Sequence, residues 1–470
     1  MAHIRVQRHY IHTSYLFAAA LEVLLIFCAS WLGHVSRLGY WPAWSDYWQP
    51  AVAFAVTQII AMTAMGVYES RLREGYSGMM LRTAVAIFLL GTMGFAILAF
   101  FIPILEMGRG VLLFSASEAF ILIAISRWVT NRLIDEDALK NRVVVLGTGH
   151  RSLKIATRMR RKSDTRAFVL TGFLQQSGMD DLITEHGAEV IKINLPLQEY
   201  CKKQRIDEIV VATDERRRDG NAPGLPIDEL LECRTDGVDI CEVQAFIERE
   251  AGKVDVDLLH PSWIIFSDGF VTNQFRLFVK SIFDKIAALA LLAFVWPVML
   301  VTGLCIGIGS FFRAPILYRQ ERVGLDGVSF FVLKFRSMSV DAEQGGAKWA
   351  TTNDSRVTKI GAFIRKTRID ELPQLINVLK GEMSFVGPRP ERPIFVNEIK
   401  ESVPYYDQRH KIKPGITGWA QLCYPYGASI DDAKEKLQYD LYYLKNHSLL
   451  LDLIILLQTV EVVLVGEGAR

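Results

Sequence analysis

The chain has 470 residues, of which 50% are hydrophobic and only 22% are charged. This composition is too apolar for a disordered protein and high for a protein that is soluble throughout. The 53 Lys and Arg nearly balance the 51 Asp and Glu, which argues against nucleic-acid binding through bulk positive charge. The six cysteines are scattered and form no C-x-x-C pair, so neither a disulfide framework nor a zinc ribbon is expected.

Residues 1–135 are dominated by apolar segments, which lie at residues 14–33, 50–68, 83–105 and 111–126. Each is close to the ~20 residues that a helix needs to cross a bilayer, so we expect four transmembrane helices. Basic residues precede the first segment, lie between the second and third, and follow the fourth. The positive-inside rule then predicts that the N-terminus and everything after residue 127 are cytoplasmic. Buried core helices are the alternative for any single segment.

Residues 136–262 have the alternating pattern of a Rossmann-like α/β domain. A buried strand is expected to run into the glycine turn at Gly147 and Gly149, and a helix is expected over residues 151–161. Further strand-like segments lie at residues 167–174, 188–191 and 208–213. Strands that alternate with helical patterns predict a parallel sheet with helices on its faces.

The glycine turn raises the question of a dinucleotide site, because G-x-G is part of the Rossmann fingerprint. The third glycine of that fingerprint is replaced by Ser152, and Tyr200 is followed four residues later by Gln204 rather than by Lys. A membrane-anchored NAD-dependent epimerase or dehydratase is therefore the less favoured alternative. Whether the domain binds a nucleotide stays open.

Residues 286–312 form a long segment without charges. Pro297 removes a backbone donor near its middle and is expected to bend the helix there. The segment is compatible with a kinked span or with a re-entrant hairpin, over about residues 282–312, that enters one leaflet and returns. Just upstream, residues 275–285 are basic and amphipathic, which suits an anionic leaflet surface, and we expect an interfacial or core-packed helix at residues 447–466.

Two clusters of charged residues follow. A strand over residues 330–335 would direct Lys334 and Arg336 to the same face, which suits a diphosphate, although a solvated strand face is the simpler alternative. Asp370 and Glu371 are adjacent, so they cannot flank one bond as glycosidase carboxylates do. They can divide the work between a nucleophile and a metal ligand. Alternatively, Asp370 is the N-cap of a helix with Pro373 in its first turn.

Two rigid turns complete this part of the chain. Prolines fix the turn within residues 381–393, where Arg389 and Arg392 offer planar forks for phosphate oxygens. Residues 411–421 form a glycine-rich turn with Trp419, which we interpret as a lid, a nucleotide wall or a plain turn.

These clusters, in this order, resemble the bacterial sugar transferase family of polyprenyl-phosphate phosphoglycosyl transferases. The resemblance runs from about residue 275 to the C-terminus. It rests on KFRSM, DELPQLINVLKGEMSFVGPRP and KPGITGWAQ, which begin at Lys334, Asp370 and Lys413. Four predicted spans followed by a Rossmann-like domain also resemble the long members that initiate exopolysaccharide or O-antigen chains.

The resemblance implies transfer of a sugar-1-phosphate from a UDP-sugar to undecaprenyl phosphate, with Mg²⁺ and release of UMP. It implies that Asp370 is the nucleophile of a phosphosugar-enzyme and that Glu371 helps to hold Mg²⁺. It also implies a catalytic domain over residues 263–470, on the cytoplasmic face of the bacterial inner membrane, with a re-entrant helix broken at Pro297. The candidates for phosphate binding are Lys334, Arg336, Arg365, Arg368 and Arg389.

Some questions stay open at this point. The sequence does not choose among glucose, galactose and N-acetylated sugars, and it is compatible with both a monomer and a homodimer. A non-catalytic membrane scaffold for polysaccharide assembly is the other alternative; it predicts no UMP release from any UDP-sugar.

Overall fold

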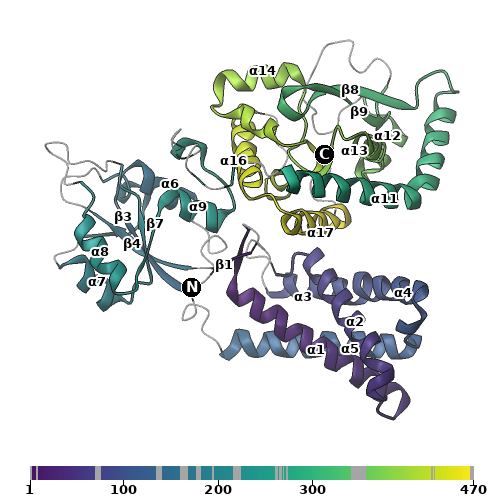
Figure 1. Ribbon diagram of the computed structural model, residues 1–470, viewed down its shortest axis with the longest axis horizontal. Helices are drawn as coiled ribbons and strands as arrows, with labels where there is room; N and C mark the ends of the chain where they lie inside the picture. Colours follow the sequence, from purple (N-terminus) through teal and green to yellow (C-terminus); the bar gives the residue numbers. More distant parts are fainter. Residues whose placement is uncertain are drawn as a thin grey trace. The chain divides into compact units, whose positions relative to one another are not determined.

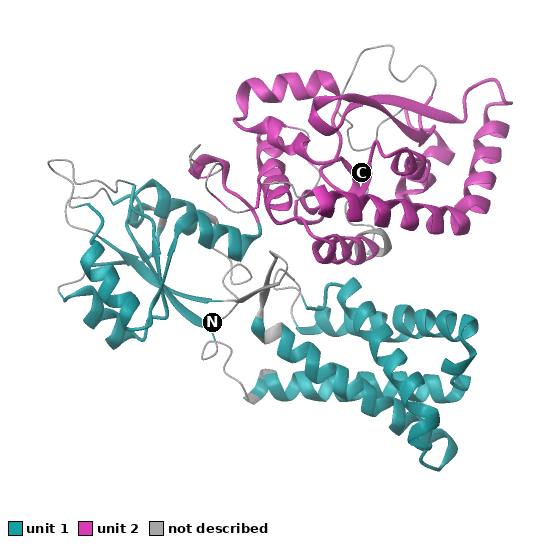
Figure 2. Ribbon diagram, in the orientation of Figure 1, with its two compact units in different colours: residues 1–252 teal, residues 253–470 magenta. Residues whose placement is uncertain are grey.

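The structure is a computed structural model that divides into two compact units, residues 1–252 and 253–470 (Figure 2). It describes residues 3–6, 9–68, 76–133, 140–158, 168–175, 181–192, 195–214, 224–259, 263, 267, 269–270, 274–339, 356–424, 427 and 429–465.

The first unit begins with the antiparallel strands β1 (His3–Val6) and β2 (His9–His12), and apolar helices follow. The helices are α1 (Thr13–Leu38), α2 (Trp44–Ala64), the continuous stretch of α3 (Tyr76–Val85), η1 (Ala86–Gly91) and α4 (Thr92–Phe101), and α5 (Arg109–Leu133). In the part of the chain that is described, four helices are long and apolar enough to suggest membrane spans: Leu16–Leu38, Tyr76–Phe101, Arg109–Thr130 and Gln274–Gly309. Three of them coincide with predicted N-terminal spans. The remaining predicted span falls largely in α2, whose first turn carries Asp46 and is more polar.

A buried ion pair joins these N-terminal helices. Glu22 of α1 is 3% exposed, and its carboxylate accepts hydrogen bonds from the Arg127 guanidinium of α5, the shorter at 2.6 Å. The same guanidinium donates to Thr83 of α3, and the Tyr68 hydroxyl donates to Glu22. Charges among apolar helices are tolerated when they are paired in this way.

The first unit also contains a five-stranded parallel sheet. The sequence predicted a parallel sheet and four of its strands. The strands are β3 (Asn141–Leu146), β4 (Phe168–Leu174), β5 (Val190–Ile191), β6 (Glu208–Val211) and β7 (Asp239–Glu242), in the order β5-β4-β3-β6-β7. Helices α6 (His150–Arg158) and α9 (Val243–Ala251) cover one face, and α7 (Leu197–Gln204) and α8 (Ile227–Thr235) cover the other (Figure 1). The edge strand β7 is short and half polar, and the sequence analysis missed it.

In the second unit, the short 3₁₀ helix η5 (Val256–Leu258) precedes α11 (Gln274–Gly309), a single 36-residue helix with Pro297 inside it. Figure 1 shows α11 turning sharply part way along its length. The basic amphipathic segment at residues 275–285 forms the first turns of α11 and continues without a break into the apolar segment. Apolar side chains along α11 are exposed, including Phe294 at 74% and Ile308 at 64%.

Small sheets and short helices follow. Strands β8 (Leu317–Val323) and β9 (Ser329–Phe335) form an antiparallel hairpin, and β10 (Ser384–Val386) pairs in parallel with β11 (Gly415–Thr417). The helices are α12 (Lys359–Lys366), α13 (Gln374–Lys380), α14 (Pro393–Ser402), α15 (Trp419–Cys423), α16 (Ile430–Asn446) and α17 (Leu449–Val465), with the 3₁₀ helices η7 (Ile369–Glu371) and η8 (Tyr406–Lys411).

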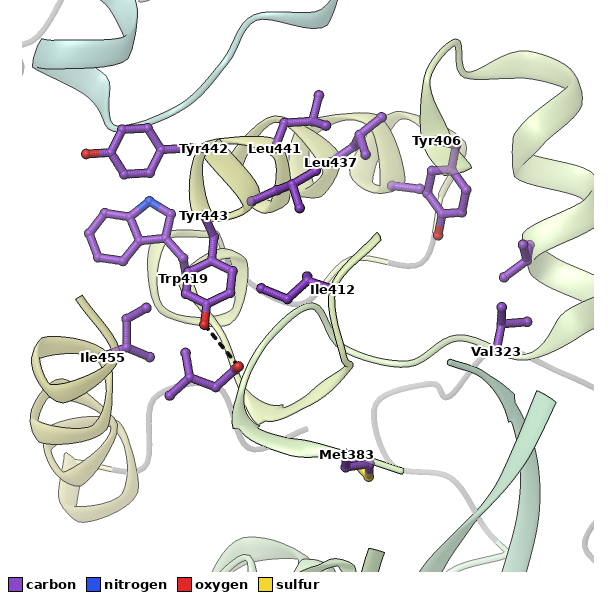
Figure 3. Packing of buried hydrophobic residues seen from close by; sticks show 14 of the residues in the cluster. Val323, Met383, Tyr406, Ile412, Trp419, Leu437, Leu441, Tyr442, Tyr443 and Ile455 are labelled. Atoms are coloured by element: carbon purple, nitrogen blue, oxygen red, sulfur yellow. Dashed lines mark hydrogen bonds between the residues drawn. The ribbon is translucent and has the colours of Figure 1, made fainter. Parts of the chain in front are cut away.

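The core of this unit lies around α16. Leu437 and Leu441 of α16 belong to the same buried cluster as Ile412, and Figure 3 shows Trp419 near Tyr442 and Tyr443. The Trp419 ring is 4% exposed and stacks on Tyr442 with ring centroids 5.9 Å apart. Because the Trp419 indole is buried in the core, it cannot stack on a nucleotide, and our interpretation of the turn as a nucleotide wall is wrong for this residue.

Candidate active site

An unusual turn presents the two adjacent carboxylates. Helix α12 ends at Lys366, and Arg368 then adopts a left-handed conformation with φ of 57° before the short helix η7. A non-glycine residue in this region costs of order 1 kcal/mol and is found where the surroundings hold it. The N-cap of the following helix α13 is Pro373. Asp370 is therefore not the N-cap, and the capping alternative is wrong.

Both carboxylates are buried, Asp370 at 8% and Glu371 at 9% exposed. An apolar cluster lies beneath them, in which Ile306 of α11 packs with Phe335 and Ile364, and Ile369 adjoins the cluster. The segment of α11 that follows Pro297 thus shares one apolar cluster with Ile369, the residue before Asp370.

Glu371 is surrounded by three cations that the sequence analysis had selected. Its Oε1 lies 2.8 Å from Lys334 Nζ and 3.2 Å from Arg389 Nη2, and its Oε2 lies 3.8 Å from Arg368 Nη1. Burial by itself would raise the pKa of Glu371, but the Lys334 ammonium and the Arg389 guanidinium outweigh it and hold the pKa well below its ordinary value. Glu371 is therefore an anion throughout the physiological pH range.

Asp370 has a different environment. No described residue donates a hydrogen bond to its carboxylate, and burial raises its pKa above the ordinary value even though the positive charges of Lys334, Arg365 and Arg368 oppose the shift. Two neighbouring carboxylates whose pKa values are pushed apart are typical of groups with different roles. Asp370 has the oxygen lone pairs available for attack, whereas those of Glu371 are engaged.

Lys334 reaches the carboxylates because a buried asparagine fixes its strand. Asn377 of α13 is fully buried; its Oδ1 accepts from Leu333 N at 3.0 Å, and its Nδ2 donates to Phe331 O at 2.8 Å. These bonds replace the ladder partner that β9 lacks on this side and set the position of Lys334. We did not assign Asn377 a role from the sequence, although it lies within the DELPQLIN motif.

The remaining predicted residues lie around this centre in different ways. Arg365 of α12 acts on Asp370 through its charge. Arg336 follows β9, and no described carboxylate pairs with it; its Nη1 is buried without a hydrogen-bond partner. A buried donor of this kind costs free energy unless a ligand satisfies it, so it suits an anionic substrate. Arg389 also donates from Nη1 to Gln421 Oε1 at 3.5 Å, a partner that the sequence analysis did not name. Pro297 lies in α11, outside this group.

The donor set suits magnesium better than zinc. Within the described ranges, no group of three or more His, Cys, Asp and Glu side chains could hold a metal ion. Mg²⁺ commonly uses only one or two protein carboxylates together with substrate phosphates and water. Glu371 Oε2, whose nearest cation is 3.8 Å away, is the less engaged oxygen for such a role.

The glycine turn of the α/β domain binds the carboxylate of Asp214, a residue of the same domain. Asp214, which follows β6, accepts from the backbone N–H of His150 at 2.7 Å and of Arg151 at 2.9 Å, at the start of α6. A Cβ on Gly149 would lie 2.0 Å from Asp214 Oδ2, which explains the glycine. In Rossmann folds this position receives the pyrophosphate of the dinucleotide. Asp214 occupies it here, which weighs further against the NAD-dependent alternative.

Comparison with known proteins gives a consistent family. The family model described as bacterial sugar transferase matches residues 275–466, which include the whole of this site. The UDP-N-acetylgalactosamine-undecaprenyl-phosphate N-acetylgalactosaminephosphotransferase of Aeromonas hydrophila is 40% identical over 241 residues, covering 51% of this chain and 56% of the relative. The UDP-glucose:undecaprenyl-phosphate glucose-1-phosphate transferase of Xanthomonas campestris pv. campestris is 40% identical over 194 residues, covering 41% of this chain and 40% of the relative.

The matched region therefore spans about half the length of these relatives. A shorter relative, the UDP-glucose:undecaprenyl-phosphate glucose-1-phosphate transferase of Caulobacter vibrioides, is 37% identical over 192 residues, covering 40% of this chain and 71% of the relative. The region matched by the family model includes the carboxylates and the three cations on Glu371. The chain belongs to the bacterial sugar transferase family.

Proposed function

We propose that this protein transfers a sugar-1-phosphate from a UDP-sugar to undecaprenyl phosphate, the membrane step that starts an exopolysaccharide or O-antigen chain. The observation that carries the proposal is the pair of buried carboxylates in one cationic site. Asp370 accepts no hydrogen bond from a described residue, whereas Glu371 is bound by Lys334, Arg368 and Arg389. The names of the relatives supply the substrate classes.

The chemistry is a double displacement at one phosphorus atom. A carboxylate oxygen of Asp370 attacks the phosphorus that carries the sugar, and the bond from that phosphorus to the oxygen of UMP breaks. An oxygen of the lipid phosphate then attacks the same phosphorus, the bond to Asp370 breaks, and the carboxylate is restored. Each attack is by an anion on an anion, so neutralisation of the phosphate oxygens is the main requirement.

The cations of the site meet this requirement. The Lys334 and Arg389 side chains, at 21% and 33% exposed, can bind phosphate oxygens while they remain beside Glu371. The buried Nη1 of Arg336 offers a further donor. Mg²⁺ bound by Glu371 and the diphosphate would supply additional positive charge at the departing UMP.

The membrane arrangement follows from the substrates. The sugar nucleotide cannot enter the bilayer and the polyprenyl chain cannot leave it, so the site must lie at the interface. We propose that α11 is re-entrant about Pro297, that the N-terminal helices form four spans, and that the site faces the cytoplasm. The proline, the bend of α11 and the apolar cluster that joins Ile306 to Ile369 support this arrangement.

The test uses the full-length protein in nanodiscs with undecaprenyl phosphate and Mg²⁺. We expect UMP release and a lipid-linked sugar diphosphate from UDP-glucose or UDP-N-acetylgalactosamine. The control is the same protein with GDP-mannose, which should release no nucleotide. Absence of UMP release from a full panel of UDP-sugars would exclude the proposed function and favour a non-catalytic scaffold.

A further inference from the structure

The turn that carries Arg389 is held through its carbonyl oxygens. Three of the seven residues in Gly387–Pro393 are prolines and have no N–H to donate, so few backbone donors of the turn itself are available to fix it. The backbone N–H of Gly415 donates to the carbonyl of residue 388 at 3.0 Å, and that of Val323 donates to the carbonyl of residue 391 at 2.9 Å.

Arginine side chains donate hydrogen bonds to the two intervening carbonyls, those of residues 389 and 390. Arg409 Nη2 donates to the carbonyl of Arg389 at 3.0 Å, and Arg322 Nη1 donates to the carbonyl of Pro390 at 2.9 Å. Four successive carbonyls, from residue 388 to residue 391, are thus hydrogen-bonded to other parts of the unit. The backbone on both sides of the Arg389 side chain is fixed by charged groups from η8 and β8.

Arg409 has no nitrogen left for a substrate. It is 5% exposed, its Nε donates to Asp440 Oδ2 at 3.0 Å, and its Nη1 donates to the Tyr406 hydroxyl at 2.6 Å. The guanidinium also lies over the Tyr406 ring, 5.0 Å from its centroid. Asp440 is 2% exposed. Burying such a pair requires desolvation that its attraction only roughly repays, so stability is a weak reason for its presence.

The consequence of this network appears at the other end of Arg389. With its backbone fixed, the guanidinium lies 3.2 Å from Glu371 and 3.5 Å from Gln421, and a third of the side chain remains exposed for a ligand. A displacement of the turn by about 1 Å would break these contacts, and misplacement of that size is enough to lower rates by about 10²-fold.

We propose that Arg409, held by Asp440, is a positioning residue for the transfer reaction, with Arg322 in the same role on the next carbonyl. Together they keep the Arg389 guanidinium where the diphosphate of the sugar nucleotide binds. This inference rests on the proposed function.

The experiment is a double-mutant cycle between Arg409→Lys and Arg389→Ala in the full-length protein, with UMP release from UDP-glucose or UDP-N-acetylgalactosamine as the readout. Lysine keeps the charge beside Asp440 but cannot reach the carboxylate, the phenol and the carbonyl together. We expect R409K to lower kcat/KM for the UDP-sugar about tenfold, and to change it less than twofold when Arg389 is already alanine.

A matched control separates positioning from stability. Arg249 in the α/β domain is also an arginine with a bidentate carboxylate, Glu208 at 2.8 and 2.9 Å, and with an aromatic ring, Phe246, beneath it. R249K should lower the unfolding temperature and leave kcat/KM unchanged. If R409K does not fold, Arg322→Lys provides the same cycle. The Arg322 side chain is 19% exposed and that of Arg409 is 6% exposed, so the change at Arg322 should disturb folding less.

The outcomes are distinct. If R409K matches the wild type, or lowers kcat/KM equally with and without Arg389, the positioning role is wrong while the proposed function stands. If the wild type releases no UMP from any UDP-sugar, the proposed function fails, and this inference fails with it.

Discussion

Two aspartates in this protein show how the same side chain serves structure or chemistry. Asp214 is exposed, yet both of its oxygens accept hydrogen bonds from the first amides of α6. Asp370 is buried, yet no described residue donates a hydrogen bond to it, and its neighbours act on it through charge. The partners of the carboxylate oxygens, rather than burial, therefore distinguish a helix cap from a candidate nucleophile.

The largest expected effect is the loss of the nucleophile. Asp370→Asn should lower UMP release by at least about 10³-fold, because an amide cannot form the phosphosugar intermediate. The protein should stay folded, since no hydrogen bond from a described residue is lost. Asp326→Asn, at an exposed ion pair with Lys411, is the control. Wild-type activity in D370N would refute the assignment of Asp370.

Glu371→Gln should have the next largest effect. The change leaves Lys334 and Arg389 without their common anion, so we expect about 100-fold lower activity and a loss of about 2 kcal/mol in the free energy of unfolding. Glu435→Gln, at the partly exposed pair with Lys253, provides the comparison. Unchanged activity in E371Q would show that Glu371 only balances the cations.

The acid limb of the pH profile should report Asp370. Its pKa is raised by burial, and only its anion attacks, so kcat/KM should fall at a higher pH than an ordinary aspartate would cause. Lys334 lowers this pKa, and Lys334→Gln should therefore shift the acid limb to still higher pH. Lys411→Gln, an exposed lysine, should not shift it. A shift to lower pH in K334Q would contradict this account of the charges.

The smallest effect is expected at Asp214. Asp214→Ala removes the cap of α6 and should cost about 1 kcal/mol. Hydrogen exchange of the His150 and Arg151 amides in the full-length protein should be faster, while UMP release stays within twofold of wild type. Asp239→Ala, at an exposed strand position, is the matched control. A large loss of UMP release would mean that this turn takes part in the reaction.

Local patterns predicted much of this architecture. The apolar strands of the α/β domain, the strand that carries Lys334, and the proline within α11 follow from neighbouring residues, and the structure agrees with them. Local signals failed at β7, where the strand is short and half of its residues are polar.

The site was only partly predictable for a physical reason. The motifs pointed to Asp370, Glu371 and the nearby cations. Which cation reaches Glu371 depends on tertiary contacts, such as the hydrogen bonds of Asn377 to the backbone of β9. Arg409 acts from 20 residues away in the sequence, and Asp214 reaches α6 from 63 and 64 residues away. No local pattern marks such pairs.

The central claim is that the sugar phosphate is bound covalently to Asp370 between the two half-reactions. The most direct measurement is the intact mass of the full-length protein after incubation with the UDP-sugar and Mg²⁺ without undecaprenyl phosphate. The account predicts a gain of one sugar phosphate, located on the peptide that contains Asp370, which disappears when undecaprenyl phosphate is added. An unmodified protein that releases UMP only when both substrates are present would contradict it.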